Sequence, residues 1–233
     1  MKCTISRKVQ RIPRAPETRA WYAGFRPARN APAGGLASAS APRTKDTEPT
    51  ATAKQAAPPD RKAVVVSGAW RVEGNELVGS SPGDAPENAP SLLLLGSTRL
   101  SRYELRFRAK IVKGTRFYAV FEYASLKDCC FLEVGDIGGR EVSLHNMHAG
   151  EDDVHEGMRK PFEPRLDTWY DVRIVVDGSR YTCFLDNKEL FQFVADQSRE
   201  GRVGLAVWRS SAHFRDIVVT SLEGKELWKG VPE

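Results

Sequence analysis

The stretch that decides the fold is Gly201–Thr220, GRVGLAVWRSSAHFRDIVVT. Val203, Leu205 and Val207 alternate with other residues, and apolar residues return at 217–219 after a polar segment. A period of two places successive side chains on opposite faces of a β-strand. The stretch therefore predicts two strands joined by a polar turn, each with one buried face.

Similar patterns recur through the second half of the chain. An alternating strand is predicted at 103–110, and an aromatic and β-branched strand at 115–123. Three more strands are predicted around two tight-turn dipeptides; they span 170–176, 181–185 and 189–193, with Asp177-Gly178 and Asp186-Asn187 between them. No ten-residue helical pattern stands out. Many short strands with turn signals predict an all-β fold, a jelly-roll sandwich of two antiparallel sheets.

Residues 1–62 differ from the rest of the chain. They carry thirteen Lys or Arg and four Asp or Glu, a formal charge of +9, whereas the remainder carries 22 basic and 26 acidic residues, or −4. Ala, Pro, Ser and Thr dominate 27–60, and such a segment buries too little apolar area to offset its ordering entropy. We expect a disordered basic tail at 1–62 and one sandwich domain at 63–233.

Composition narrows the range of partners. Because the excess positive charge lies in the tail, we expect no nucleic-acid binding by the domain. No run of about eighteen apolar residues predicts a membrane helix, and residues 2–30 lack the apolar centre of a signal peptide. The Arg-rich start fits a targeting segment, a disordered arm or a start codon assigned too far upstream. The compartment stays open.

Several motifs resemble, in order, the 3-keto-disaccharide hydrolase (glycoside-hydrolase-like) family. They are WRVEGNELVG at 70–79, YELRFR at 103–108, Trp169 followed by Asp177-Gly178, the G-R-V-G-L … F-R-D-I frame of 201–217, and GKELW at 224–228. This family groups concanavalin A-like (laminin-G/glucanase-like) β-sandwich domains. The resemblance implies a concanavalin A-like jelly roll with a function related to sugars.

The sequence departs from the family pattern where chemistry is expected. The family's N-S-G-I segment is replaced after Gly114 by Thr115-Arg116-Phe117-Tyr118, its W-N asparagine by Tyr170, and its closing Gln and His by Ala206 and Trp208. Glycoside hydrolysis usually needs two facing carboxyl groups, but Glu133 and Asp136 would point to opposite faces of a straight strand. Lost polar groups and a gained aromatic ring favour binding over hydrolysis.

One sheet face is the candidate site. Arg116, Tyr118 and Glu122 are expected to share a strand face, His145 to end another strand, and Trp208 to offer a flat platform for a pyranose. The candidate ligand-binding residues are Arg116, Tyr118, Glu122, His145, Trp208 and Arg209. If the chain is a hydrolase, the candidate catalytic residues are Glu122, Glu133 and His145. The alternative is the ordinary wet face of an antiparallel sheet.

A His-rich loop offers a possible metal site. It contains His145, His148 and His155 with Glu151, Asp152, Asp153 and Glu156. Their spacing matches no zinc signature, so we expect no cofactor, with a structural calcium ion as an alternative.

The remaining cysteine and tryptophan residues are expected to be structural. Adjacent Cys129 and Cys130 should face opposite sides of a strand and, like Cys183, be buried free thiols; a disulfide with Cys183 would require neighbouring strands. Trp70, Trp169 and Trp228 are expected to pack in the core or at sheet edges.

These patterns favour a non-catalytic module that binds a carbohydrate or glycoconjugate, or another protein. A divergent 3-keto-disaccharide hydrolase-like glycoside hydrolase is the alternative, and a structural accessory domain is the third hypothesis. Whether the chain is an enzyme stays open.

Overall fold

A computed structural model describes residues 62–86, 89–152 and 157–232. Apart from Lys62, the predicted disordered tail lies outside the described residues. Those residues form strands, turns and loops and contain no helix, so none of their segments is a helix that could cross a membrane.

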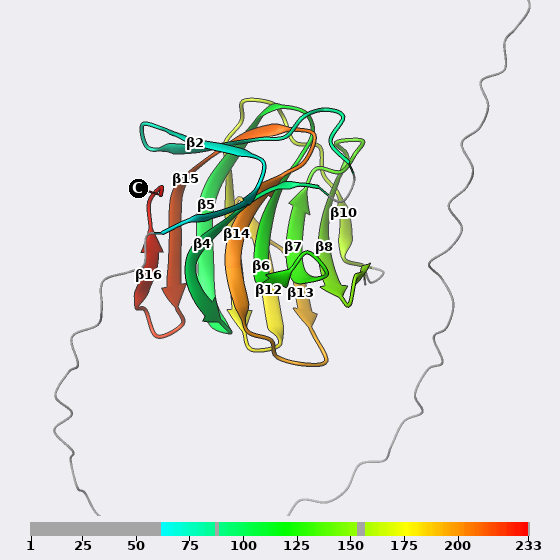
Figure 1. Cartoon of the computed structure of the whole chain (residues 1–233). Helices are drawn as coiled ribbons and strands as arrows, with labels where there is room; N and C mark the ends of the chain where they lie inside the picture. The colour runs from blue at the N-terminus through cyan, green and yellow to red at the C-terminus, as the bar shows by residue number, and fades with distance from the viewer. Residues whose placement is uncertain (1–61, 87–88, 153–156, 233) are drawn as a thin grey trace, which may run out of the picture. The chain divides into compact units, whose positions relative to one another are not determined.

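Two antiparallel sheets, with eight strands each in the described residues, form the fold (Figure 1). Sheet A contains, in spatial order, β1 (Val64–Ser67), β4 (Ser91–Leu100), β14 (Gly201–Val207), β6 (Phe117–Ser125), β7 (Asp128–Val134), β8 (Glu141–His148) and β10 (Arg159–Pro161), and β9 (Glu151–Asp152) also pairs with β8. The order places strands that are distant in sequence side by side, with β14 between β4 and β6.

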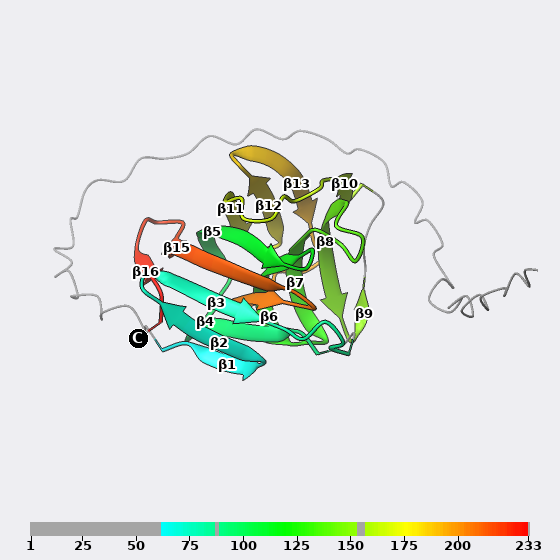
Figure 2. The same ribbon diagram turned by 90° about the horizontal axis from the view of Figure 1, so that it is seen from above.

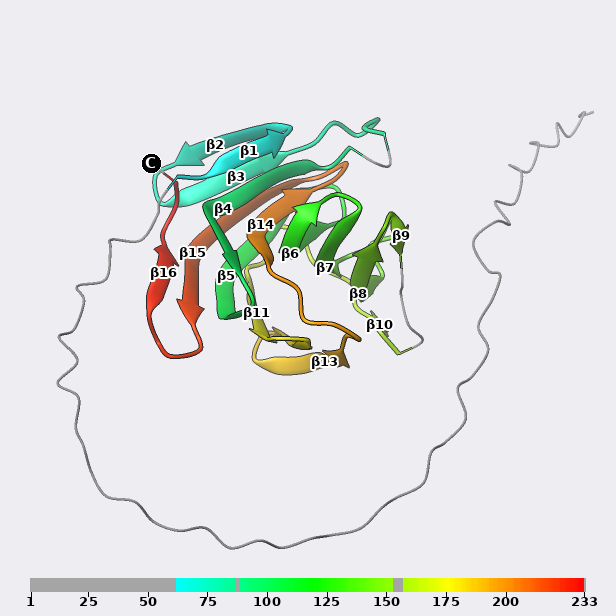
Figure 3. The same ribbon diagram turned by 60° about the horizontal axis from the view of Figure 1, so that its bottom comes forward.

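Sheet B contains β13 (Lys188–Val194), β12 (Arg180–Leu185), β11 (Tyr170–Asp177), β5 (Arg102–Lys113), β15 (Ser211–Ser221), β3 (Glu76–Ser80) and β2 (Ala69–Glu73), and β16 (Glu226–Lys229) also pairs with β15. Figures 2 and 3 show the two sheets as two layers. The expected all-β, concanavalin A-like jelly-roll sandwich is confirmed.

The core lies between the two sheets and is built by period-two alternation. On β5, Tyr103, Leu105 and Phe107 are buried, whereas the residues between them are more exposed. Phe107 packs against Phe117 of sheet A and Phe214 of sheet B, with ring centroids 6.3 and 5.9 Å away. Such aromatic pairs contribute about 0.5–1.5 kcal/mol each beyond the burial of their area.

The segment Gly201–Thr220 belongs to both layers. Its first part is β14 in sheet A, and its second part lies within β15 in sheet B. The two strands predicted from this segment are confirmed, and the connection through Trp208, Arg209 and Ser210 joins one sheet to the other. This connection lies beside the candidate site.

A bulge in β6 changes the side-chain alternation that the sequence predicts. Glu122 has a φ of +49°, and the pairing of β6 with β7 shifts between Phe121 and Ser125. Phe121 and Glu122 both face the core side, whereas Tyr123 joins Tyr118 on the other face. The expectation that Glu122 shares a face with Tyr118 is therefore wrong, because a bulge inserts one extra residue into the alternation.

Candidate ligand-binding site

Strand register brings the candidate residues together on the outer face of sheet A, the face turned away from the core. Tyr118 of β6 lies opposite Glu133 of β7, which lies opposite Ser143 of β8. Two residues further along both strands, on the same face, Phe131 of β7 lies opposite His145 of β8. Residues at directly opposed positions have Cβ atoms about 5 Å apart, so these side chains contact one another.

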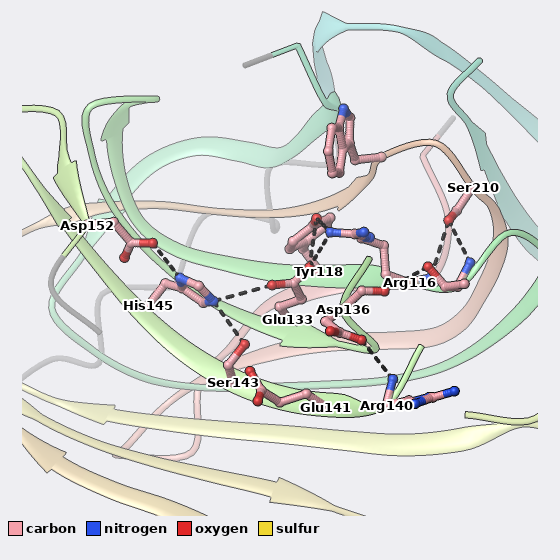
Figure 4. A network of polar contacts seen from close by, with 12 residues as sticks. Arg116, Tyr118, Glu133, Asp136, Arg140, Glu141, Ser143, His145, Asp152 and Ser210 are labelled. Carbon is pink, nitrogen blue, oxygen red and sulfur yellow. Dashed lines mark hydrogen bonds and ion pairs between the residues drawn. The ribbon is translucent and has the colours of Figure 1, made fainter. Parts of the chain in front are cut away.

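Glu133 is the centre of a buried polar network (Figure 4). Glu133 as a residue is 8% exposed, and Arg116 beside it is 5% exposed. Arg116 Nη1 lies 2.7 Å from Glu133 Oε1, and the Tyr118 hydroxyl donates to the same oxygen over 3.1 Å. Burial raises the pKa of Tyr118, and the charge of Glu133 raises it further. The phenol therefore stays protonated as a donor.

His145 extends this network to a second carboxylate. Its Nδ1 lies 2.7 Å from Asp152 Oδ2, and its Nε2 lies 3.3 Å from Glu133 Oε2. Burial lowers the pKa of His145, but the hydrogen bonds to Asp152 and Glu133 outweigh burial and raise the pKa above its ordinary value. The arrangement therefore favours the charged imidazolium, held between two carboxylates.

Ser143 lies close enough to His145 to suggest a Ser–His–Asp arrangement. The Ser143 hydroxyl oxygen is 2.9 Å from His145 Nε2. However, Ser143 is 1% exposed, and an attacking serine must reach a substrate carbon. The contact therefore serves to orient the imidazole.

Trp208 closes one end of the network and is not the open platform that the sequence suggested. The guanidinium carbons of Arg116 and Arg209 lie 4.6 and 4.5 Å from the centroid of its ring. Its indole N–H donates to the Pro86 carbonyl over 2.7 Å, and the residue is 5% exposed. A ring covered in this way cannot stack on a pyranose, so Trp208 supports the wall of the site.

Arg209 has a similar structural role. Its Nε donates to the Ala85 carbonyl over 2.8 Å. Together with the Trp208 bond to Pro86, this contact holds the segment before β4 against the β14–β15 connection. The sequence placed Arg209 at the turn correctly but did not show this partner.

Glu122 belongs to a different cluster, on the core side of β6. Its Oε2 accepts hydrogen bonds from the Tyr181 hydroxyl over 2.6 Å and from Arg199 Nε over 3.1 Å. Burial raises the pKa of Glu122, although Tyr181 and Arg199 oppose this effect. Because Glu122 lies on the opposite side of the sheet from Tyr118, it cannot act on a ligand bound beside Glu133.

Phe131 is the residue of this face that sequence reasoning missed. It stacks on His145 with ring centroids 4.4 Å apart and planes 13° apart, and it meets Tyr118 edge to face at 5.6 Å. Phe131 and Tyr118 are both half-buried, so part of each ring remains open to solvent. The alternation of Cys129, Phe131 and Glu133 along the strand could have predicted that Phe131 shares a face with Glu133.

The His-rich loop is only partly described. His148 is exposed, with Nδ1 3.4 Å from Asp128 Oδ1, and His155 lies outside the described residues, as do Asp153 and Glu156. In the described part of the chain, no group of three or more His, Cys, Asp or Glu side chains is arranged to hold a metal ion. The alternative of a structural calcium ion stays a hypothesis.

Adjacent Cys129 and Cys130 point to opposite sides of β7, as expected: Cys130 lies in the main core and Cys129 in the outer apolar cluster. Both are buried free thiols, and so is Cys183 on β12 of the other sheet.

The fold and this face together define a class, the concanavalin A-like β-sandwich with a polar and aromatic outer sheet face. Residues 52–220 match the model of the 3-keto-alpha-glucoside-1,2-lyase-like domain. The chain belongs to this family and is a carbohydrate-related β-sandwich. No curated protein matches the sequence.

Solved structures with a similar fold include two carbohydrate-binding domains and a galectin-like protein. The carbohydrate-binding module CBM66 from Bacillus subtilis is 20% identical, with a TM-score of 0.58 over 68% of this chain and 95% of that one. The Emp47p carbohydrate recognition domain is 12% identical, with a TM-score of 0.52 over 69% and 87%. A galectin-like protein of unknown function from Bacillus subtilis is 11% identical, with a TM-score of 0.51 over 74% and 91%. At these identities the likeness is one of fold.

Proposed function

We propose that this domain binds carbohydrate on the outer face of sheet A without transforming it. The observation that carries the proposal is the pair of half-buried rings, Tyr118 and Phe131, beside the network centred on Glu133. Sugar rings present apolar C–H faces and polar rims. An aromatic surface beside fixed hydrogen-bonding groups suits both.

The polar groups have separate roles in this proposal. The Tyr118 hydroxyl meets the sugar hydroxyls, while Arg116 holds Glu133 in place and Asp152 holds the imidazole of His145 behind it. Trp208 and Arg209 fix the wall next to Arg116. The site is therefore rigid before the ligand arrives, which lowers the entropic cost of binding.

Both carboxylate oxygens of Glu133 already have partners, which supports binding over catalysis. One carboxylate oxygen is held by Arg116 and Tyr118, and the other contacts His145. A general base must accept a proton from the substrate, and an oxygen held by a guanidinium is poorly suited to that role. The proposal is also supported by the similarity of this fold to that of the carbohydrate-binding module CBM66.

Catalysis on a 3-keto-glucoside is the second candidate function. The family description names a 1,2-lyase of such sugars, and the 3.3 Å contact between Glu133 and His145 joins a carboxylate to an imidazolium. In an elimination, Glu133 would take the C2 proton, which the adjacent ketone acidifies. A C1=C2 double bond would form as the C1–O bond breaks, and His145 would donate a proton to the leaving oxygen.

A glycan array followed by calorimetry tests the first proposal. We expect the full chain to bind a subset of printed glycans, and Phe131→Ala to weaken binding of the best glycan at least tenfold, because a stacked aromatic contact is lost. Phe184→Ala is the matched control, since Phe184 is a half-buried phenylalanine on the outer face of sheet B. Unchanged affinity in Phe131→Ala would overturn the proposed site.

The two candidate functions differ in turnover. A 3-keto-glucoside is incubated with the full chain and with Glu133→Gln, and the released aglycone is measured. Turnover by the wild type that Glu133→Gln abolishes would replace the binding proposal with the catalytic one.

A further inference from the structure

A second group of side chains lies on the outer face of sheet B and has no part in the proposed function. Arg108 and Lys110 lie on β5, Arg215 lies on β15, and Trp169 directly precedes β11. Their cationic groups surround one indole ring: the guanidinium carbons of Arg215 and Arg108 lie 4.1 and 5.9 Å from its centroid, and Lys110 Nζ lies at 4.8 Å. We call these four residues the Trp169 cluster.

The strand register concentrates positive charge at the Trp169 cluster. Arg215 lies directly opposite Arg108. Like charges at opposed positions of an antiparallel pair destabilise the sheet. Stability of the sheet alone would favour an acidic residue at one position of this pair.

Nearby carboxylates offset this charge only in part. Arg108 Nε lies 3.1 Å from Asp171 Oδ1, and Arg215 Nε lies 3.5 Å from Asp216 Oδ2, but neither Nε makes a hydrogen bond. Among the described residues, no carboxylate lies within ion-pair distance of Lys110 Nζ. The charges of Lys110 and Arg215 contribute to lowering the pKa of Glu76, but that carboxylate makes its hydrogen bond with His213. Lys110 therefore lies beside an aromatic ring and other cations without an ion-pair partner of its own.

We propose that the Trp169 cluster is a second binding site, which takes the carboxylate or sulfate groups of an acidic polysaccharide. The proposal rests on the proposed function in one respect, that the ligand is a saccharide. Guanidinium groups bind oxyanions through paired donors, and an ammonium group adds a point charge. The half-buried indole of Trp169 supplies an apolar surface beside them.

The spacing of the charges suits a linear chain. Arg108 and Lys110 are two residues apart on one strand and face the same side, which places them about 7 Å apart along β5. Arg215 adds a third cation on the neighbouring strand, directly opposite Arg108. A polymer with regularly repeated acidic groups can meet several of these cations at once.

The experiment compares Lys110→Glu and Arg108→Ala with the wild type in the full chain. The probes are polygalacturonate for carboxylate, dextran sulfate for sulfate, and neutral dextran. We expect each variant to bind the preferred acidic probe about tenfold or more weakly, the loss expected for a charge-assisted contact. Neutral dextran should not respond to either change. The basic residues at 1–62 add the same background to every variant.

Arg102→Ala is the matched control. Arg102 lies on the same strand and face, but it pairs with Asp177 and Glu223, so its removal should leave the acidic-probe affinity within twofold. Unfolding midpoints in urea check that every variant is folded. Acidic-probe binding that Lys110→Glu and Arg108→Ala leave unchanged would overturn the proposal.

Two further measurements separate this site from the one on sheet A. Phe131→Ala should leave binding of the acidic probe unchanged even if the sheet A proposal fails, because the two surfaces lie on different sheets. Single-stranded DNA that binds the cluster more tightly than either acidic polysaccharide would overturn the saccharide assignment.

Discussion

Glu133 is the single residue on which the candidate site most depends. A buried ion pair is tolerable only when hydrogen bonds satisfy its remaining polar atoms, because both charges have left water. Arg116, Tyr118 and His145 meet this requirement for the two oxygens of Glu133. The sequence indicated a carboxylate on a strand, but it did not show that three donors surround it.

His145 couples the site to pH. Its folded-state pKa is raised by Asp152 and Glu133 despite burial, and the unfolded-state value is about 6.5. For a histidine with a raised pKa, the stabilisation is fully present below the unfolded-state value and is lost as pH rises through the folded-state value.

We therefore expect the free energy of unfolding to fall as pH rises above about 6.5, and His145→Gln to remove this fall. The measurement is urea unfolding between pH 5 and 9, plotted as wild type minus variant, so that other titrating groups cancel. His148→Gln is the control, because His148 is exposed with only a 3.4 Å contact to Asp128. A wild-type advantage that grows with pH would contradict the assigned charge state.

At the scale of elements, the bulge in β6 decides which carboxylate belongs to which cluster. Without it, Glu122 would lie beside Tyr118. With it, Glu122 turns toward Tyr181 of β12, and Arg199 from the β13–β14 connection closes over it. Arg199 also donates to the Met147 carbonyl of β8 over 3.1 Å, so this second cluster ties the connection to both β6 and β8.

Gly201, the first residue of the segment that identified the fold, makes this bulge possible. A Cβ atom at position 201 would lie 2.0 Å from the carbonyl carbon of Glu122. The backbone of β14 can approach the bulge this closely only without a side chain. The glycine in the G-R-V-G-L frame is therefore required by a contact with a residue 79 positions earlier.

We expect Gly201→Ala to lower the free energy of unfolding by about 3 kcal/mol, the upper end for overpacking, because the obstructing atoms are backbone. Gly83→Ala is the control, since a Cβ there meets nothing within 4 Å and its φ is not positive. Urea unfolding of the three proteins makes the comparison. Equal stability of Gly201→Ala and Gly83→Ala would show that the bulge can shift to accept a methyl group.

At the scale of the whole molecule, the sandwich separates two surfaces of different character. The outer face of sheet A carries Glu133, His145 and aromatic rings, whereas the outer face of sheet B carries the Trp169 cluster. Both outer faces arise from the same period-two alternation that builds the core. What a ligand meets depends on which strands are neighbours in each sheet.

Removing residues 1–53 should leave the urea midpoint of the sandwich unchanged, because the described strands begin at Val64. This segment carries ten Lys or Arg and three Asp or Glu, so its loss should also weaken non-specific binding to acidic polymers at low salt. Urea unfolding and binding to dextran sulfate measure the two effects. A lowered midpoint would contradict the predicted boundary between tail and domain.

The sequence by itself determined the fold class, the strands of 201–220, the 170–193 meander and the opposite facing of Cys129 and Cys130. These follow from period-two alternation and turn residues, which act over a few neighbouring positions. Only the tertiary structure decided that Glu133 meets Arg116 and His145, that Trp208 is covered, and that Glu122 leaves the site. Strand pairing and the bulge depend on contacts between residues far apart along the chain. The local alternation of residues therefore cannot predict either feature.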